Sequence, residues 1–214
     1  DPHALTAGAD CTDPARDFAG NHTDPYAVDL GDGARLIVAD FAAIGEKALT
    51  DEAAMARYRG DAAMIARLAQ GGRGVFVTEH PPLGGVVIGK KHGKLDVGYA
   101  PVGQAFDVAT RVPELPGVTG VISGHVHLLQ VVARDGYPVQ VINGFSGTAE
   151  EEPRAPATLA ELRALSDGAG YRDIATLFGR FGFGVMERMA GGRWRYTARD
   201  VEGRVMLSRV IEPR

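Results

Sequence analysis

The sequence predicts a mixed α/β (α+β) fold, from three patterns along the chain. Residues 50–72 carry a helical pattern that leads directly into the short apolar run 74–78, which is the order expected beside a sheet. Residues 128–142 have the pattern of an antiparallel hairpin with an Asp-Gly turn. Residues 181–211 alternate apolar and polar positions between Gly turns, which is typical of an antiparallel meander. We therefore expect sheets with helix packed beside them.

The first half of the chain supplies the local signals for a hairpin and a helix. Residues 25–30 and 34–40 are strand-like and are separated by a Gly-Asp-Gly turn. Thr50 is the expected N-cap of the helix, with two acids following in its first turn, where the helix dipole favours them. Gly71 and Gly72 are expected to end it. Asp40, after the second strand, is expected to cap or turn the chain rather than to act in a site.

The second half contains more irregular segments. Residues 83–117 are expected to form a long Gly-rich connection, either a phosphate-steering cationic loop or a solvated one. It contains Lys90, Lys91 and Lys94, beside His92. Short helices are expected at residues 105–110 and 158–165, and a strand at 118–122. Trp194 and Tyr196 lie two residues apart, which favours a packed sheet face over a binding surface.

Composition limits the classes of protein to which the chain can belong. The 214 residues suffice for one sizeable domain, covering residues 1–214, and 45% hydrophobic with 23% charged residues is typical of a globular protein. A formal net charge of −4 gives no reason to expect nucleic acid as a bulk partner. No apolar run approaches the roughly 20 residues of a membrane helix, so no membrane partner is expected. Cys11 is the single cysteine and cannot form an internal disulfide, which leaves the compartment open.

Histidines follow two of the apolar runs. His80 comes directly after the run 74–78 and is followed by Pro81 and Pro82, which stop the strand. His125 and His127 follow the run 118–122 after Ser-Gly. Ligand sites in α/β sheets are usually built at the carboxyl ends of strands, and imidazole is the commonest neutral metal ligand. The joint pattern therefore predicts a metal site at this edge.

Strand-His-Pro-Pro followed by strand-Gly-His-x-His resembles the C-terminal half of the calcineurin-like metallophosphoesterases. The residues that carry the resemblance are His80-Pro81-Pro82 and Gly124-His125-Val126-His127. The resemblance implies a calcineurin-like β-sandwich flanked by helices, here lacking its N-terminal strands. It implies that His80 and His125 bind one metal ion and His127 another, the two ions being divalent Zn, Mn, Fe or similar. It also implies hydrolysis of a small phosphorylated substrate by a hydroxide bound to two metal ions.

The family's upstream carboxylate motifs are not found in this chain. Letter matches at residues 1–3 and 10–13 are read as coincidence, because parallel strands need a crossover of a dozen or more residues between them. Gly20-Asn21-His22 matches the family's Gly-Asn-His motif, so Asn21 is a conditional metal ligand and His22 a conditional catalytic acid. A surface loop is the alternative for this tripeptide. We expect a chain that is N-terminally incomplete and is completed by an upstream segment or a second chain.

Two other functions stay open at this point. The chain could be a non-catalytic fragment or subunit with an incomplete metal site, because its carboxylate ligands are not visible. It could also be a mononuclear hydrolase that adds Glu79 to the three histidines, since three His and an open position form a known zinc arrangement. Adjacent residues of a strand point to opposite faces, which argues against Glu79 beside His80. The sequence does not identify the substrate or choose between monoester and diester.

Overall fold

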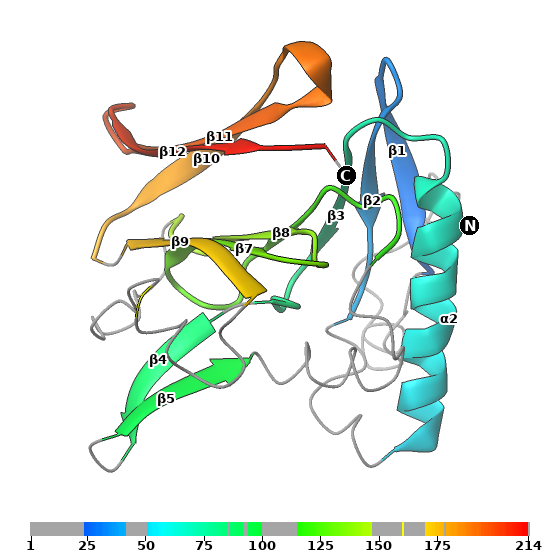
Figure 1. Cartoon of the computed structure of the whole chain (residues 1–214), viewed down its shortest axis with the longest axis horizontal. Helices are drawn as coiled ribbons and strands as arrows, with labels where there is room; N and C mark the ends of the chain where they lie inside the picture. Colours follow the sequence, from blue (N-terminus) through cyan, green and yellow to red (C-terminus); the bar gives the residue numbers. More distant parts are fainter. Residues whose placement is uncertain are drawn as a thin grey trace, which may run out of the picture.

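The computed structural model describes residues 24–41, 51–84, 86–91, 94–99, 115–146, 160, 170–177 and 179–213. For residues 86–91 and 94–99 this description covers the backbone. A seven-stranded sheet forms the centre of the molecule (Figure 1). The helix α2 (Glu52–Ala69) packs on one face, and a three-stranded sheet packs on the other. A mixed α/β fold is thus confirmed, with a sandwich-like pairing of two sheets.

The central sheet is parallel in its middle and antiparallel at its edges. Its strand order is β1-β2-β3-β6-β8-β7-β9. The strands are β1 (Tyr26–Gly31), β2 (Ala34–Val38), β3 (Val75–Glu79), β6 (Gly120–Ser123), β7 (Leu129–Arg134), β8 (Val139–Asn143) and β9 (Tyr171–Leu177). Strands β2, β3, β6 and β8 run parallel, β1 and β7 join them antiparallel, and β9 pairs antiparallel with β7. The carboxyl ends of the four parallel strands therefore meet at one edge.

Strand β3 shows how the sequence divides its side chains between two cores. Val75 and Val77 pack with Tyr58 and Ile65 of α2 on one face of the sheet. Phe76, between them, packs on the other face and meets the ring of Trp194 edge-on, with centroids 5.2 Å apart. This two-residue alternation is the pattern of a strand buried on both faces.

The helix begins one residue later than the sequence suggests. Asp51 is the N-cap, and its side chain accepts hydrogen bonds from the backbone N–H groups of Ala53 and Ala54, so the expectation of Thr50 was wrong. Both residues are good N-caps, and the sequence offers no way to choose between neighbours. The helix ends before Gly71, as expected.

The outer sheet confirms the predicted C-terminal meander. Its strands are β10 (Gly182–Arg188), β11 (Trp194–Asp200) and β12 (Val205–Ile211), in that order. A short 3-10 turn, η4 (Ala190–Gly192), joins the first two. Trp194 and Tyr196 are buried against the central sheet, so their packing role is confirmed. In the described part of the chain, the outer face of this sheet has no helix over it, so flanking helices other than α2 stay a prediction.

Two strand regions were missed by the sequence reasoning. The segment expected as a loop contains a hairpin of β4 (Val86–Lys91) and β5 (Lys94–Tyr99). Strand β9 had no prediction; it forms one edge of the central sheet and pairs antiparallel with β7. Glycines and charged residues hide the alternation of β4 and β5, and the adjacent charged residues Arg172 and Asp173 interrupt that of β9. The helices expected at 105–110 and 158–165 fall on residues outside the described ranges, apart from helical residue 160. No helix in the described ranges is long and apolar enough to cross a membrane.

Candidate metal site

Two parallel neighbours, β3 and β6, bring the predicted histidines to one edge of the sheet. The register pairs Glu79 with Ser123, the last residues of the two strands. His80 follows the first strand, and Gly124 and His125 follow the second. The backbone N–H of Gly124 donates to the carbonyl of His80 at 3.1 Å, which extends the pairing one step past the strands. The position of each imidazole is thus determined by the sheet itself.

His80 and His125 form a close pair. Nδ1 of His125 lies 3.3 Å from Nε2 of His80, and their ring centroids are 5.1 Å apart in an edge-on arrangement. Both side chains are exposed. Two imidazole nitrogens bound at about 2.0–2.1 Å to one tetrahedral ion lie about 3.3 Å apart, so the pair fits a shared ion. Without an ion, the same spacing is that of a hydrogen bond between the rings.

The loop that carries His125 has a strained backbone. His125 adopts φ of 62°, in the left-handed region that residues with a side chain rarely occupy. Such strain is found most often at ligand sites, where surrounding structure holds it in place. Here Gly144, just after β8, donates from its backbone N–H to the carbonyl of Leu128. A Cβ on Gly144 would overlap the carbonyl oxygen of Val126, so the loop packs tightly against this glycine.

Gln140, a buried residue of β8, ties the segment after His80 to the sheet. Its Oε1 accepts from the backbone N–H groups of Leu83 and Gly84 at 3.2 and 3.1 Å. Its Nε2 donates to Oγ of Ser123 at 2.9 Å. One amide thus connects the chain that follows His80 with the strand that precedes His125. The sequence reasoning missed this role, although a glutamine inside the apolar run 139–142 is a signal for it.

Replacing Gln140 with leucine should loosen the segment after His80. The substitution keeps the volume but leaves the N–H groups of Leu83 and Gly84 without their acceptor, at a cost of about 2 kcal/mol in the free energy of unfolding. Urea unfolding measures that cost, and amide hydrogen exchange measures the loosening. Gln130→Leu, at a buried glutamine on β7, is the matched control. Unchanged exchange at Leu83 and Gly84 in Gln140→Leu would contradict the role.

Glu79 points away from the histidine pair. Its side chain is buried, whereas His80 beside it is exposed, as expected for adjacent residues of a strand. Burial raises the pKa of Glu79 well above its usual range, and neither carboxyl oxygen has a hydrogen-bond partner in the described part of the chain. Glu79 raises the pKa of Tyr58 of α2, after the larger effect of that residue's own burial. These features do not suit Glu79 as a ligand beside the three histidines.

The structure brings together two of the predicted site residues. His127 is half-buried, and no group of three or more His, Cys, Asp or Glu able to hold a metal occurs within the described ranges, so its role as ligand of the second ion stays a prediction. Asn21 and His22 lie outside those ranges, so their roles stay predictions. At the end of β8, Tyr196 donates from its hydroxyl to Oδ1 of Asn143 at 2.7 Å, a contact the sequence did not indicate.

Together, these features define a mixed α/β protein with a sandwich-like core and a histidine pair at the carboxyl ends of two parallel strands. One similar solved structure is described as "GAP50 the anchor in the inner membrane complex of Plasmodium"; it shares 12% identity and a TM-score of 0.52. The match covers 89% of this chain and 53% of that one, and it supports the fold alone.

A second similar structure is that of PhoD, with 10% identity and a TM-score of 0.48. The match covers 89% of this chain and 40% of that one. The chain therefore spans about half or less of the length of these two solved structures. No protein family model and no curated protein matches the sequence.

Proposed function

We propose that this chain is part of a metal-dependent phosphoester hydrolase in which His80 and His125 bind one divalent ion. The observation that carries the proposal is the 3.3 Å separation of their ring nitrogens at the ends of two parallel strands. The sequence around both histidines, with Pro-Pro after the first and Gly-His-x-His at the second, is the pattern of the calcineurin-like phosphoesterases. The sandwich-like pairing of the sheets is consistent with it.

The remaining ligands of the proposed centre come from other positions. His127 is the candidate for the second ion, and Asn21 and His22 are candidate ligand and acid, all three by the sequence resemblance. The described residues add no carboxylate to the pair, so the completed centre needs groups outside them. When bound, two divalent ions would polarise a phosphoryl group and activate water. Zn, Mn or Fe suits imidazole ligands better than Ca.

Within this proposal, the chain's own residues hold the pair in place. The sheet register and the Gly124 to His80 hydrogen bond set the distance between the two rings. Gln140 fixes the segment after His80, and the tight packing at Gly144 fixes the loop of His125. Both rings are exposed, so a substrate phosphate can approach them from solvent. Such preorganisation lowers the cost of ordering the ligands when the ion binds.

Hydrolysis assays test the proposed activity. Loaded with Zn or Mn, the chain together with the segment or second chain that supplies its remaining ligands should hydrolyse p-nitrophenyl phosphate or bis(p-nitrophenyl) phosphate, and the preference between them distinguishes monoester from diester. His125→Ala should lower the rate more than about a hundred-fold. Loss of a residue that only hydrogen-bonds to a metal ligand already costs about 10- to 100-fold, and loss of the ligand itself should cost more. His3→Ala is the matched control, since its Asp-x-His match is read as coincidence. Hydrolysis retained in His125→Ala would contradict the site.

A non-catalytic metal-binding chain is the second candidate, favoured by the absence of a third ligand near the pair within the described ranges. It predicts that the wild-type chain binds an ion through His80 and His125 but hydrolyses neither ester. The two candidates therefore share the ion and differ in turnover. Metal content and activity measured on the same sample separate them.

A further inference from the structure

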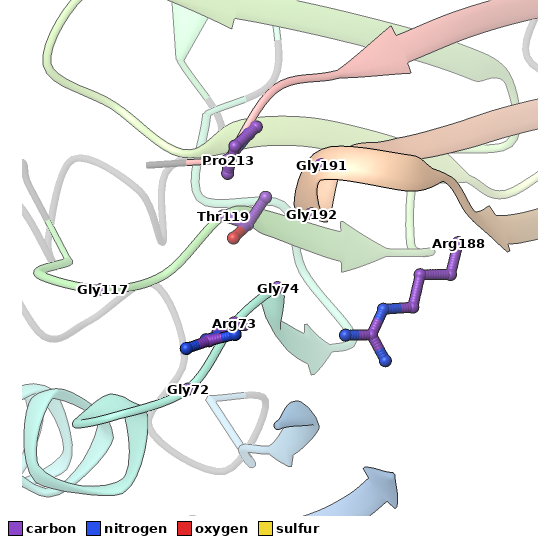
Figure 2. Close-up of a pocket in the computed structure, with 9 residues that line it drawn as sticks. All are labelled: Gly72, Arg73, Gly74, Gly117, Thr119, Arg188, Gly191, Gly192 and Pro213. Carbon is purple, nitrogen blue, oxygen red and sulfur yellow. The ribbon is translucent and has the colours of Figure 1, made fainter. Parts of the chain in front are cut away.

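A hollow lies at the edge of the central sheet opposite the histidine pair, where β3 and β6 begin (Figure 2). Its volume is about 440 Å³, within the range of small-molecule sites. Its lining is rich in glycine and contains two arginines: Gly72, Arg73, Gly74, Gly117, Thr119, Arg188, Gly191, Gly192 and Pro213. A neighbouring hollow of about 460 Å³ shares Arg73 and Arg188 and adds Asp32. The two arginines are thus common to both.

The two arginines differ in their hydrogen bonds and ion pairs. Arg188, at the end of β10, donates to the carbonyls of Gly31 and Asp32 and lies 3.2 Å from the carboxylate of Asp32. These contacts hold its side chain at the wall. The exposed guanidinium of Arg73, just before β3, makes no hydrogen bond or ion pair with another described residue. Asp32 offsets one charge, so the hollow retains one uncompensated cation among its lining residues.

The glycines keep the wall open to a ligand. Gly74, Gly117, Gly191 and Gly192 adopt φ between 74° and 87°, which side chains rarely tolerate. A Cβ on Gly74 would overlap Nε1 of the Trp194 indole, which lies directly behind it. That indole is 8% exposed, and its N–H has no partner in the described part of the chain. A buried N–H donor behind an open glycine wall adds to the positive potential of the hollow.

This hollow is separate from the histidine pair. Arg73 and His80 lie at opposite ends of β3, seven residues apart, which at about 3.3 Å per residue places them roughly 20 Å apart along the strand. A small ligand held by Arg73 cannot reach the two imidazoles. The two sites therefore require separate ligands.

We propose that this hollow binds the phosphate group of a small molecule between Arg73 and Arg188. The two arginines line the hollow from different elements, the segment before β3 and the end of β10 (Figure 2). A tetrahedral phosphate offers oxygens in several directions and can accept hydrogen bonds from both guanidinium groups. A planar carboxylate instead pairs its two oxygens with a single guanidinium group. The hollow also has space beyond a single phosphate, which accommodates the rest of a small ester.

Calorimetric titration with inorganic phosphate tests the proposal. The titration uses His125→Ala protein in excess chelator, so that binding at the histidine pair is removed and the outcome is independent of hydrolytic function. We expect saturable binding of phosphate and weaker binding of acetate. Arg73→Gln should weaken phosphate binding about ten-fold or more, because it removes a charged donor.

Arg195→Gln is the matched control, at an exposed arginine of β11 that does not line the hollow. It should leave phosphate binding unchanged, and melting temperatures verify that both variants fold. Absence of phosphate binding, equal loss in both variants, or acetate binding as tight as phosphate would overturn the proposal. Arg73→Lys should bind phosphate more tightly than Arg73→Gln, since lysine keeps the positive charge but lacks the planar set of N–H donors of the guanidinium group.

Discussion

Replacing Gly144 with alanine should destabilise the protein by about 3 kcal/mol and disturb the loop that carries His125. The added Cβ would overlap the carbonyl oxygen of Val126, a backbone atom that cannot move without shifting residues 124–128. The N–H of Gly144 also donates to Leu128, so the two segments cannot separate without losing that bond. Urea unfolding measures the loss, and metal affinity measures the effect on the site.

Gly60→Ala is the control for the substitution itself. Gly60 is an exposed residue within α2, and a Cβ there would meet nothing within 4 Å. Alanine should raise the stability by roughly 0.5–1 kcal/mol, since glycine is a poor helix former. The same chemical change is therefore expected to have opposite signs at the two positions. A Gly144→Ala protein as stable as wild type, with unchanged metal affinity, would rule out the tight packing of this loop.

The second large effect is expected at Asp61, a buried residue of α2. Burial raises the pKa of Asp61 from 3.8 to about 6; Asp24 and Asp40 add to the shift, and Arg57 opposes it. The folded state therefore keeps a proton that the unfolded state loses between about pH 4 and pH 6. Stability falls as pH rises through that window, by about 3 kcal/mol for a shift of about two pKa units. Above pH 6 the cost is constant.

Asp61→Asn should remove this pH dependence. The free energy of unfolding of the variant should match that of wild type near pH 4 and exceed it at pH 7 by up to about 3 kcal/mol. The gain is reduced by the lost attraction to Arg57, whose Nε lies 3.6 Å from the carboxylate. Urea unfolding at a series of pH values measures both curves. Glu187→Gln, at an exposed carboxylate of β10, is the control. Parallel curves for wild type and Asp61→Asn would contradict the raised pKa.

Much of the fold could be predicted where local patterns are strong. The hairpins at residues 26–38 and 129–143, the helix and the meander all carry period or turn signals in the sequence. Strands β4 and β5 were missed because glycines and charged residues mask their alternation, and β9 because two adjacent charged residues interrupt it. The pairing of all three is a property of the tertiary structure. The N-cap was predicted at Thr50 and lies at Asp51, because either side chain can accept hydrogen bonds from the first backbone N–H groups of a helix.

The candidate site could be predicted in part. His80 and His125 follow parallel neighbours, and this arrangement alone brings them together. His127 lies two residues after His125, in a loop where His125 has a left-handed backbone conformation. The alternation of apolar residues in strands does not predict the path of such a loop. Gln140 joins the site through bonds across 56 and 57 residues of chain, which local patterns do not reveal. The hollow near Arg73 and Arg188 depends on four separate segments meeting, which no local pattern indicates.

The central claim is that His80 and His125 bind one ion together, and a double-mutant cycle of Zn affinity tests it most directly. The dissociation constant would be measured for the metal-stripped wild type, His80→Ala, His125→Ala and the double variant, with His3→Ala as control. We predict that each single variant loses most of the affinity and that the double variant loses little more. Independent, additive losses, or an affinity unchanged by either substitution, would contradict a shared ion.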